Sequence, residues 1–279
     1  MKKLFIKNGW LPVIICSMAF TSCYKKFDAD SYKPPFTING YTSSDEVGAG
    51  HLTGYWSFDG TNAEAVSGAA GTSTNTGFTG GFKGQALQGA LNGYLLTPSN
   101  AGLAGMQSFT VSEWINTPPP STGIIDFFTL SNTTQFWGNI EMFFENGSTN
   151  AAGKLRVHIF QNGTDNTYAL DGVANLFDKW VNITVTYDAA TSTCTIYTNG
   201  TKAGSGPAGG VTGPLSFANV GNVVLGTTQF NTTPSQTSGA TAQPWASFLT
   251  GQLDEVRVYN VALAQPAIQA LLILQGKGK

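Results

Sequence analysis

Charged side chains are scarce in this chain of 279 residues. Asp, Glu, Lys and Arg together make up 11% of the sequence, against roughly 25% in typical soluble domains. Glycine is abundant, with 34 residues, and Thr, Ser and Asn fill most polar positions, so hydroxyls and amides solvate the surface. Because the formal net charge is −2, the chain has no basic excess for a phosphate backbone, and we expect no nucleic-acid partner.

Cysteine and histidine are also rare. Of the three cysteines, Cys16 and Cys23 lie in the N-terminal segment that is interpreted below as an export signal and its lipidation site. Cys194 is therefore left without an intramolecular disulfide partner. Cys194 alternates with polar residues in the segment TCTIY, which predicts buried packing and not a reactive thiol. The two histidines, His51 and His158, have no carboxylate or cysteine at metal-ligand spacing. We therefore expect neither a zinc site nor a catalytic triad based on histidine.

The N-terminal apolar run, residues 10–20, is too short to cross a bilayer of about 30 Å. It follows three lysines within the first seven residues, which predicts an export signal over residues 1–22. The segment FTSC at residues 20–23 resembles the end of a bacterial lipoprotein signal, with Phe where Leu is commoner. This resemblance implies that Cys23 becomes the acylated N-terminus of the mature chain. We expect the mature protein to be an outer-membrane lipoprotein at the cell surface. The alternative is an ordinary signal peptide with an incidental cysteine.

The rest of the chain divides into a tether and one domain. Residues 23–48 are polar, contain two adjacent prolines and show no sustained period, which predicts a tether. Residues 49–279 carry short runs rich in β-branched and aromatic residues between Gly, Asn and Ser clusters, the pattern of an all-β sandwich or barrel. An Asn-Gly pair at residues 199–200 predicts a hairpin, and Pro266 begins one short terminal helix. The predicted strands are residues 53–58, 108–115, 154–160, 180–187, 194–198 and 253–259.

Six short motifs follow one another along residues 50–275. They are GYWSFDG (54–60), GFKGQAL (81–87), SFTVSEWI (108–115), KWVNITVTYD (179–188), IYTNG (196–200) and GQLDEVRVYN (251–260). Their order resembles that of laminin-G-like, concanavalin A-like jelly-roll domains. The resemblance implies two antiparallel sheets in a jelly-roll sandwich, often a structural calcium ion, and glycan binding in many members. It does not fix the function, because this fold hosts lectins, hydrolases and adhesion modules.

The resemblance also suggests where calcium would bind. Asp59 and Asp254 match family positions near the opening and closing strands, which are neighbours in this fold, and Glu64 is a further candidate. Two carboxylates brought together repel one another unless a cation lies between them, and calcium favours carboxylate and carbonyl oxygens. The family's acidic residue before Ser-Gly is displaced here, where the chain reads AVSG. In the alternative, Asp59 caps a turn, and Asp254 pairs with Arg257 or accepts backbone N–H bonds.

Aromatic rings and amides are the groups that bind sugars. Phe136, Trp137 and Asn139 lie in a predicted polar turn, and Trp245 ends an unpatterned stretch at residues 231–244. Long loops without regular structure are usually functional or disordered. The sequence therefore predicts that these four residues contact a glycan. The alternative is that each tryptophan packs in the core or at its rim.

A glycoside hydrolase on this fold would need two suitably spaced carboxylates. Glu141 and Glu145 lie on one predicted strand, where positions four apart are separated by about 13 Å. Retaining glycosidases need roughly 5–5.5 Å between the carboxyl groups, and inverting ones roughly 6.5–9.5 Å. The stretch also lacks the central Asp of the Glu-x-Asp-x-Glu arrangement of related hydrolases. We therefore expect no catalysis by this pair, and a pair from separate strands stays open.

Together these patterns predict a non-catalytic outer-membrane lipoprotein whose jelly-roll domain binds a glycan. Such lipoproteins resemble accessory subunits of starch-utilisation-type systems, in which a TonB-dependent transporter and its lid lipoprotein import glycans. The alternative is a scaffold or adhesin that grips a protein and binds no sugar, and the third class is an enzyme. The first two differ in whether Trp137 and Trp245 converge on one exposed groove or are buried separately.

Overall fold

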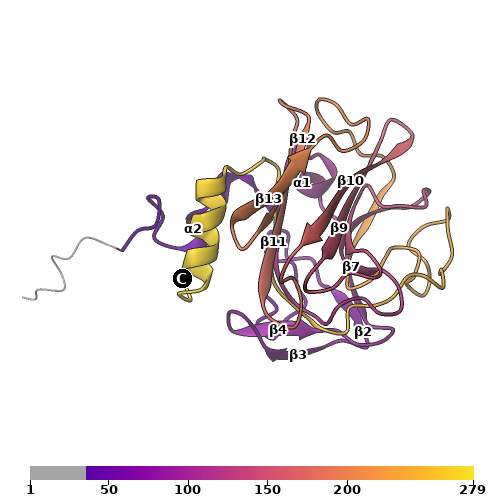
Figure 1. The fold of residues 1–279 in the computed structure, drawn as a ribbon, viewed down its shortest axis with the longest axis horizontal. Helices are drawn as coiled ribbons and strands as arrows, with labels where there is room; N and C mark the ends of the chain where they lie inside the picture. The colour runs from indigo at the N-terminus through magenta and orange to yellow at the C-terminus, as the bar shows by residue number, and fades with distance from the viewer. Residues whose placement is uncertain (1–35) are drawn as a thin grey trace, which may run out of the picture. The chain divides into compact units, whose positions relative to one another are not determined.

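Fifteen strands form two antiparallel sheets over residues 36–279, the part of the chain that the computed structural model describes (Figure 1). The eight-stranded sheet has the order β13-β12-β11-β6-β15-β4-β3, with β1 paired to β15. Its strands are β1 (Leu52–Trp56), β3 (Gly77–Gly80), β4 (Gln85–Gln88), β6 (Phe109–Asn116), β11 (Val181–Asp188), β12 (Thr193–Thr198), β13 (Thr201–Gly206) and β15 (Gln252–Tyr259). This arrangement confirms the predicted two-sheet β-sandwich.

The second sheet has seven strands in the order β10-β9-β8-β7-β14-β5-β2. These strands are β2 (Thr72–Thr74), β5 (Tyr94–Thr97), β7 (Ile125–Asn132), β8 (Ile140–Phe144), β9 (Gly153–Gln161), β10 (Thr164–Val173) and β14 (Val220–Leu225). Strand β9 illustrates why the two sheets face one another. Its Leu155, Val157 and Ile159 are buried in the core, whereas the side chains between them point to the outer face of the seven-stranded sheet.

The core between the sheets is built from large apolar side chains that alternate along the strands. Trp56 is fully buried there with Phe109 and Phe144. Cys194 is buried in the same core, and burial raises the pKa of its thiol. This agrees with the predicted role of Cys194 as packing.

Helices are short and peripheral in the described residues. They are the α-helices α1 (Ala101–Ala104) and α2 (Gln265–Gln275) and the 3-10 turns η2 (Ser44–Glu46) and η3 (Ala49–His51). Pro266 lies in the first turn of α2, where its missing N–H has no intrahelical partner to lose. The predicted terminal helix is thus confirmed. Among residues 36–279, no helix is both long and apolar enough to cross a membrane.

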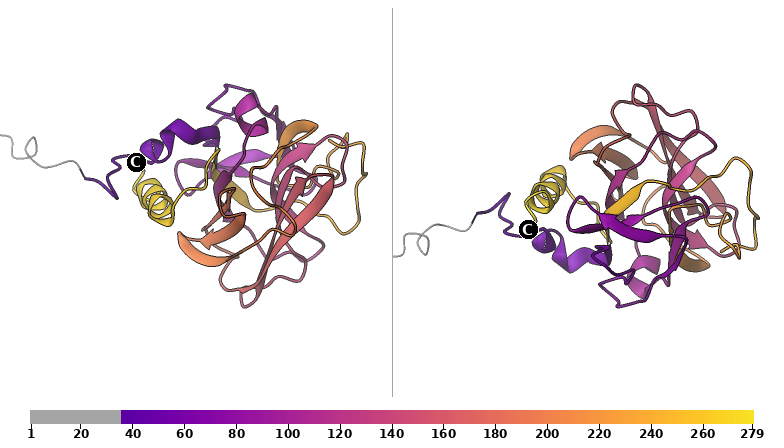
Figure 2. Two further views of the ribbon diagram at one scale, coloured as in Figure 1. Left: turned by 90° about the horizontal axis from the view of Figure 1, so that it is seen from above. Right: turned by 90° about the horizontal axis from the view of Figure 1, so that it is seen from below.

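A second hydrophobic cluster lies between α2 and the outer face of the eight-stranded sheet. Leu271 of α2 packs there with Trp114, Tyr259 and Val47. In both views of Figure 2 the N-terminal segment of the domain runs beside α2. Residues 36–48 therefore belong to the compact unit that extends to the C-terminus, and the predicted tether, residues 23–48, is too long at this end. The predicted signal peptide (residues 1–22), the lipidation site Cys23 and the rest of the tether lie outside the described residues.

The two ends of the domain meet in the eight-stranded sheet. Tyr55 of β1 is paired with Arg257 of β15, as the motif order predicts. The predicted hairpin also forms, between β12 and β13. Asn199 and Gly200 have φ angles of 49° and 74°, the left-handed conformation that this pair adopts in tight hairpin turns.

A long connection, residues 226–251, joins β14 to β15 and lies against the outer face of the seven-stranded sheet. Leu95 and Val223 point into the core, so their neighbours Tyr94 and Asn222 point outward. The Tyr94 hydroxyl contacts the backbone of Thr233, and the Asn222 amide donates to the Gln236 side chain at 2.8 Å. Figure 1 shows this connection on the side of the domain away from α2. It shapes the face described next.

Candidate functional site

Four aromatic side chains meet on the outer face of the seven-stranded sheet. Phe136 and Trp137, from the turn between β7 and β8, lie against Phe230 and Trp245 of the 226–251 connection. The ring centroids of Trp137 and Trp245 are 5.9 Å apart, and those of Phe136 and Trp245 are 6.0 Å apart and nearly parallel. Phe230 is fully buried beneath them, whereas Trp245 is 41% exposed. We call Phe136, Trp137, Phe230 and Trp245 the aromatic cluster.

The turn that carries Phe136 and Trp137 is fixed by the side chain of Gln229. Its amide oxygen accepts from the Asn132 N–H at 2.7 Å, and its amide nitrogen donates to the carbonyls of Gln135 and Phe136 at 2.8 and 3.0 Å. The Thr237 hydroxyl also donates to the Gln135 carbonyl, at 2.6 Å. Two segments about a hundred residues apart are thereby locked together. The half-buried Phe136 and Trp137 and the exposed Trp245 are thus held in place before a ligand binds, so binding costs little conformational entropy.

The ring of Trp137 lies on other side chains of the same sheet face. It is parallel to Phe143, with centroids 5.5 Å apart, and lies 4.3 Å from the ring of His158. His158 Nδ1 is 2.9 Å from an oxygen of Asp165, a carboxylate on β10. His158 is nearly buried, with 7% of its surface exposed. The histidine ring therefore supports the tryptophan ring from below, and its Nδ1 is held by Asp165.

Two buried carboxyl groups lie on the same outer face. Glu141 alternates with the core residues Ile140 and Met142 on β8, and Asp126 is paired with Phe143 across the β7–β8 ladder. Burial raises the pKa of Asp126 well above its usual value, and the neighbouring Glu141 carboxylate raises it further. Burial likewise raises the pKa of Glu141, to about 8. An oxygen of Glu141 accepts from the Gly138 N–H at 2.8 Å, which ties this group to the turn of the aromatic cluster.

These carboxyl groups are not placed for attack on a polysaccharide. Asp126 and Glu141 are both fully buried, and neither lines the pocket beside Tyr94 or the pocket beside Pro118. Glu145 lies at the surface, with an oxygen 3.5 Å from Nε of Arg156. A general acid and its partner must both reach the scissile bond. Asp126 and Glu141 do not meet this requirement.

Asn139, predicted to contact a glycan, is placed in the interior. It is fully buried, and its amide nitrogen donates to the carbonyls of Ser131 and Ala218 at 2.9 and 3.1 Å. Its amide oxygen accepts from Asn132 at 3.3 Å. With these partners inside the protein, Asn139 fixes the turn between β7 and β8 and does not reach the surface. The sequence alone does not distinguish it from the half-buried Phe136 and Trp137 of the same turn.

The three carboxylates predicted to bind calcium are held by the protein's own donors. An oxygen of Asp59 accepts from the Gln85 N–H at 2.8 Å, and one of Asp254 accepts from the Lys83 N–H at 2.9 Å. Both carboxylates thus hold the turn between β3 and β4 by hydrogen bonds. Glycine is needed in this turn, because a Cβ at Gly81 would overlap the Asp254 carboxylate and a Cβ at Gly84 would overlap that of Asp59.

Glu64 is buried, and its carboxylate accepts from the N–H groups of Tyr55, Val66 and Ser67 at 2.7–2.8 Å and from the Ser67 hydroxyl. Within residues 36–279, no three His, Cys, Asp or Glu side chains are grouped so that they could hold a metal ion. The residues present do not fit a calcium ion shared by Asp59, Glu64 and Asp254. Calcium binding elsewhere by this chain stays an untested prediction.

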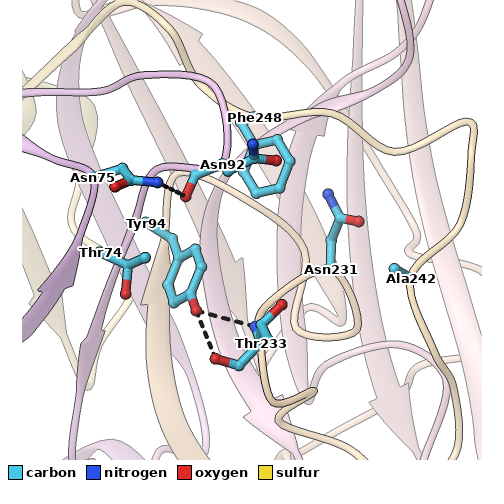
Figure 3. A pocket seen from close by; sticks show the side chains of 8 residues that line it. All are labelled: Thr74, Asn75, Asn92, Tyr94, Asn231, Thr233, Ala242 and Phe248. Carbon is cyan, nitrogen blue, oxygen red and sulfur yellow. Dashed lines mark hydrogen bonds between the residues drawn. The ribbon is translucent and has the colours of Figure 1, made fainter.

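A polar pocket that the sequence did not reveal lies on the same sheet face (Figure 3). It has a volume of about 380 Å³ and is bounded by β2, β5 and the 226–251 connection. Tyr94 and Phe248 contribute rings, and Asn75, Asn92 and Asn231 contribute amides. Because these residues come from three distant segments, only the folded chain brings them together.

The fold is a two-sheet β-sandwich that carries the aromatic cluster and the polar pocket on the outer face of its seven-stranded sheet. Residues 88–269 match the family model described as the concanavalin A-like lectin/glucanases superfamily. The chain belongs to this superfamily, as the order of motifs in its sequence predicts. No curated protein sequence matches the chain.

Solved structures of similar fold are mostly binding domains. Domain 4 of AbnA, an extracellular arabinanase from Geobacillus stearothermophilus solved with arabinotriose, is 18% identical with a TM-score of 0.56, covering 79% of this chain and 98% of that domain. The binding domain of Paraclostridial mosquitocidal protein 1 is 13% identical with a TM-score of 0.58, covering 81% of this chain. The binding domain of botulinum neurotoxin DC, solved with rat synaptotagmin II, is also 13% identical with a TM-score of 0.58, and the match covers 84% of this chain. This chain spans about half the length of each toxin domain. At these identities the likeness shows the fold alone.

Proposed function

We propose that residues 36–279 bind a glycan at the aromatic cluster and do not cleave it. The observation that carries this proposal is the convergence of Trp137 and Trp245, whose ring centroids lie 5.9 Å apart at the surface. Tryptophan rings offer flat apolar faces that pack on the C–H faces of sugars. The buried Phe230 and the Gln229 hydrogen bonds hold the cluster in place. The arabinotriose held by the similar domain 4 of AbnA supports a sugar as the ligand.

Removing either tryptophan ring of the cluster is expected to weaken this binding strongly. We predict that Trp137→Ala and Trp245→Ala each weaken the affinity for the preferred polysaccharide by tenfold or more, as the loss of a central aromatic anchor does. Affinity electrophoresis or calorimetry of the purified chain measures the effect. Phe78→Ala is the matched control, because Phe78 is a similarly exposed aromatic, 39% accessible, on β3 of the other sheet. Equal weakening by all three variants, or by none, would place binding elsewhere.

A protein ligand is the second candidate. Trp245 is among the most exposed large apolar side chains of the described residues, and aromatic residues are enriched in protein interfaces. The similar toxin domain solved with synaptotagmin II supports this alternative. In this case the chain acts as a scaffold or adhesin. The wild-type protein then binds no glycan, and the tryptophan variants lose binding to a protein partner.

The proposal includes a place in the cell envelope. We infer from the lipoprotein-like segment FTSC that Cys23 is lipidated and anchors the domain in the outer membrane, facing the cell surface. There the domain would serve a glycan-uptake complex with a TonB-dependent transporter and its lid lipoprotein. This last step is supported by the resemblance of lipoproteins with such domains to accessory subunits of glycan-uptake systems.

Lipidation has a direct test. Cells expressing the chain with radiolabelled palmitate are expected to incorporate label into the wild-type protein and not into Cys23→Ser. The Cys194→Ser variant is the matched control, because this thiol is buried in the core and should not affect labelling. An unlabelled wild-type protein, or label retained in Cys23→Ser, would contradict the anchor.

A further inference from the structure

The polar pocket is a second concave feature of the domain, built from residues outside the aromatic cluster. Its walls come from Thr74 and Asn75 at the end of β2, from Asn92 and Tyr94 at the start of β5, and from the 226–251 connection. Figure 3 shows these side chains around one hollow, with Asn231 and Ala242 on the side opposite Thr74. Its volume of about 380 Å³ lies at the small end of the roughly 300–1,000 Å³ range of small-molecule sites.

The lining carries no formal charge. It consists of three Asn, two Thr, one Tyr, one Ala and one Phe. A charged ligand would lose water here without gaining a counter-ion, which is unfavourable. An uncharged ligand with several hydroxyl groups matches the lining better, because amides both donate and accept hydrogen bonds as hydroxyls do.

Several of these polar groups retain bonding capacity toward the pocket. The Asn75 amide donates to the Asn92 carbonyl at 3.3 Å, and the Asn231 amide donates to the Thr227 hydroxyl at 3.2 Å. Each of these bonds uses one amide N–H, so a second N–H and the amide oxygen of each residue stay available toward a ligand. The Asn92 side chain makes no hydrogen bond to the described residues and is exposed at the pocket rim.

Two rings and a fixed wall complete the site. Phe248 is half-buried and Tyr94 is buried, and each contributes apolar ring surface on which the C–H groups of a sugar can pack. The Tyr94 hydroxyl donates to the Thr233 carbonyl at 2.9 Å and accepts from the Thr233 N–H at 3.0 Å. The Thr227 hydroxyl donates to the Ser247 carbonyl at 2.9 Å. These bonds hold the connection against the sheet, so the pocket exists before a ligand arrives.

We propose that this pocket binds one neutral sugar unit and forms a second carbohydrate site beside the aromatic cluster. This second site goes beyond the proposed function, because none of the four residues of the aromatic cluster lines the pocket. The cluster suits the flat faces of a longer chain, whereas the open pocket, with its small volume of about 380 Å³, suits a single unit in contact with amides. A domain with both sites would hold a polysaccharide at two points and gain avidity from their linkage.

Filling the pocket tests the proposal with little risk to the fold. Ala242 lines the pocket from an exposed position, so Ala242→Trp adds bulk without removing a side-chain contact. Thr241→Trp is the matched control, one exposed residue earlier in the connection and outside the lining. Asn231→Ala is a second, independent variant, which removes one amide from the pocket lining instead of filling the pocket. Backbone amide shifts of the purified chain are followed by NMR during titration with glucose, galactose, mannose, xylose and arabinose, and with glucuronate as the charged probe.

We expect at least one neutral sugar to shift the amides of residues 74–75, 92–94 and 231–233 saturably. Ala242→Trp should weaken this Kd at least tenfold and Asn231→Ala several-fold, while Thr241→Trp leaves it unchanged and glucuronate binds at least tenfold more weakly. Absence of these shifts with every neutral sugar, or unchanged affinity in Ala242→Trp, overturns the proposal.

The Trp137→Ala, Trp245→Ala double variant separates the two sites. If it loses the polysaccharide while the pocket shifts persist, both proposals hold. If it loses the polysaccharide and no sugar shifts the pocket residues in wild type, only the pocket proposal fails. If pocket binding and full polysaccharide affinity both persist, the proposed function of the cluster fails.

Discussion

Arg257→Met is expected to lower the free energy of unfolding by about 3 kcal/mol. The guanidinium of Arg257 is buried, 3.2 Å from an oxygen of Glu255 and 2.8 Å from one of Asp45. It also donates to the Ser44 carbonyl at 3.1 Å and lies 4.1 Å from the centre of the Tyr55 ring. Removing it leaves the fully buried Glu255 carboxylate without its nearest cation. The loss falls at the lower end of the usual range because Lys83 stays 3.5 Å from Glu255.

The matched control for this prediction is Arg156→Met. Arg156 also contacts two carboxylates, but the side chains of these partners, Glu145 and Asp171, keep 34% and 63% of their surface exposed. Exposed pairs contribute about 0–1 kcal/mol, so this variant should unfold at nearly the wild-type urea concentration. Urea denaturation followed by tryptophan fluorescence measures both. Equal losses in the two variants would show that burial of the Arg257 network does not stabilise the fold.

The stability of the domain is expected to fall as pH rises from about 4.5 to about 8. Burial raises the pKa of Glu113 and Asp126, and it raises the pKa of Glu141 from 4.5 to about 8. Such groups bind their protons more tightly in the folded chain than in the unfolded chain. For each group, the unfolding free energy therefore decreases with pH between the pKa in the unfolded chain and the higher pKa in the folded chain. Above the folded-state pKa it no longer changes. The total decrease is expected to be a few kcal/mol, since each pKa unit corresponds to about 1.4 kcal/mol.

Neutral replacements on the outer face should reduce this dependence. The Asp126→Asn, Glu141→Gln double variant is expected to show a clearly shallower slope between pH 5 and 8 by urea denaturation. Glu145→Gln is the control, because Glu145 directly follows β8 and is partly exposed; this variant should keep the wild-type slope. A double variant as pH-sensitive as the wild type would mean that these two carboxyls already ionise in the folded chain.

The architecture could be predicted because its signals are local. Alternating apolar residues mark strands such as β9 and β11, the Asn199-Gly200 pair adopts the turn that its residue types favour, and Pro266 marks the start of α2. The domain boundary was less visible. Residues 36–48 contain no periodic pattern, and Val47 is buried only because α2 returns beside it.

The candidate site was only partly visible in the sequence. Trp137 and Trp245 stood out because tryptophan is rare in polar loops, and the structure brings them together. Asn139 was misread because burial of an amide depends on neighbours such as Ala218, which the local sequence does not specify. The polar pocket was missed for the same reason, since residues 74–75, 92–94 and 231–248 meet only in the folded chain.

The central claim is that this face holds a polysaccharide and leaves it intact. Its most direct test incubates the purified chain with a panel of soluble polysaccharides that includes arabinan, and measures both retention of the polysaccharide and release of reducing ends. We predict retention of at least one polysaccharide, its loss in the Trp137→Ala, Trp245→Ala double variant, and no new reducing ends at any protein concentration. Release of reducing ends that disappears in the Asp126→Asn, Glu141→Gln double variant, or retention of no polysaccharide at all, would contradict the account.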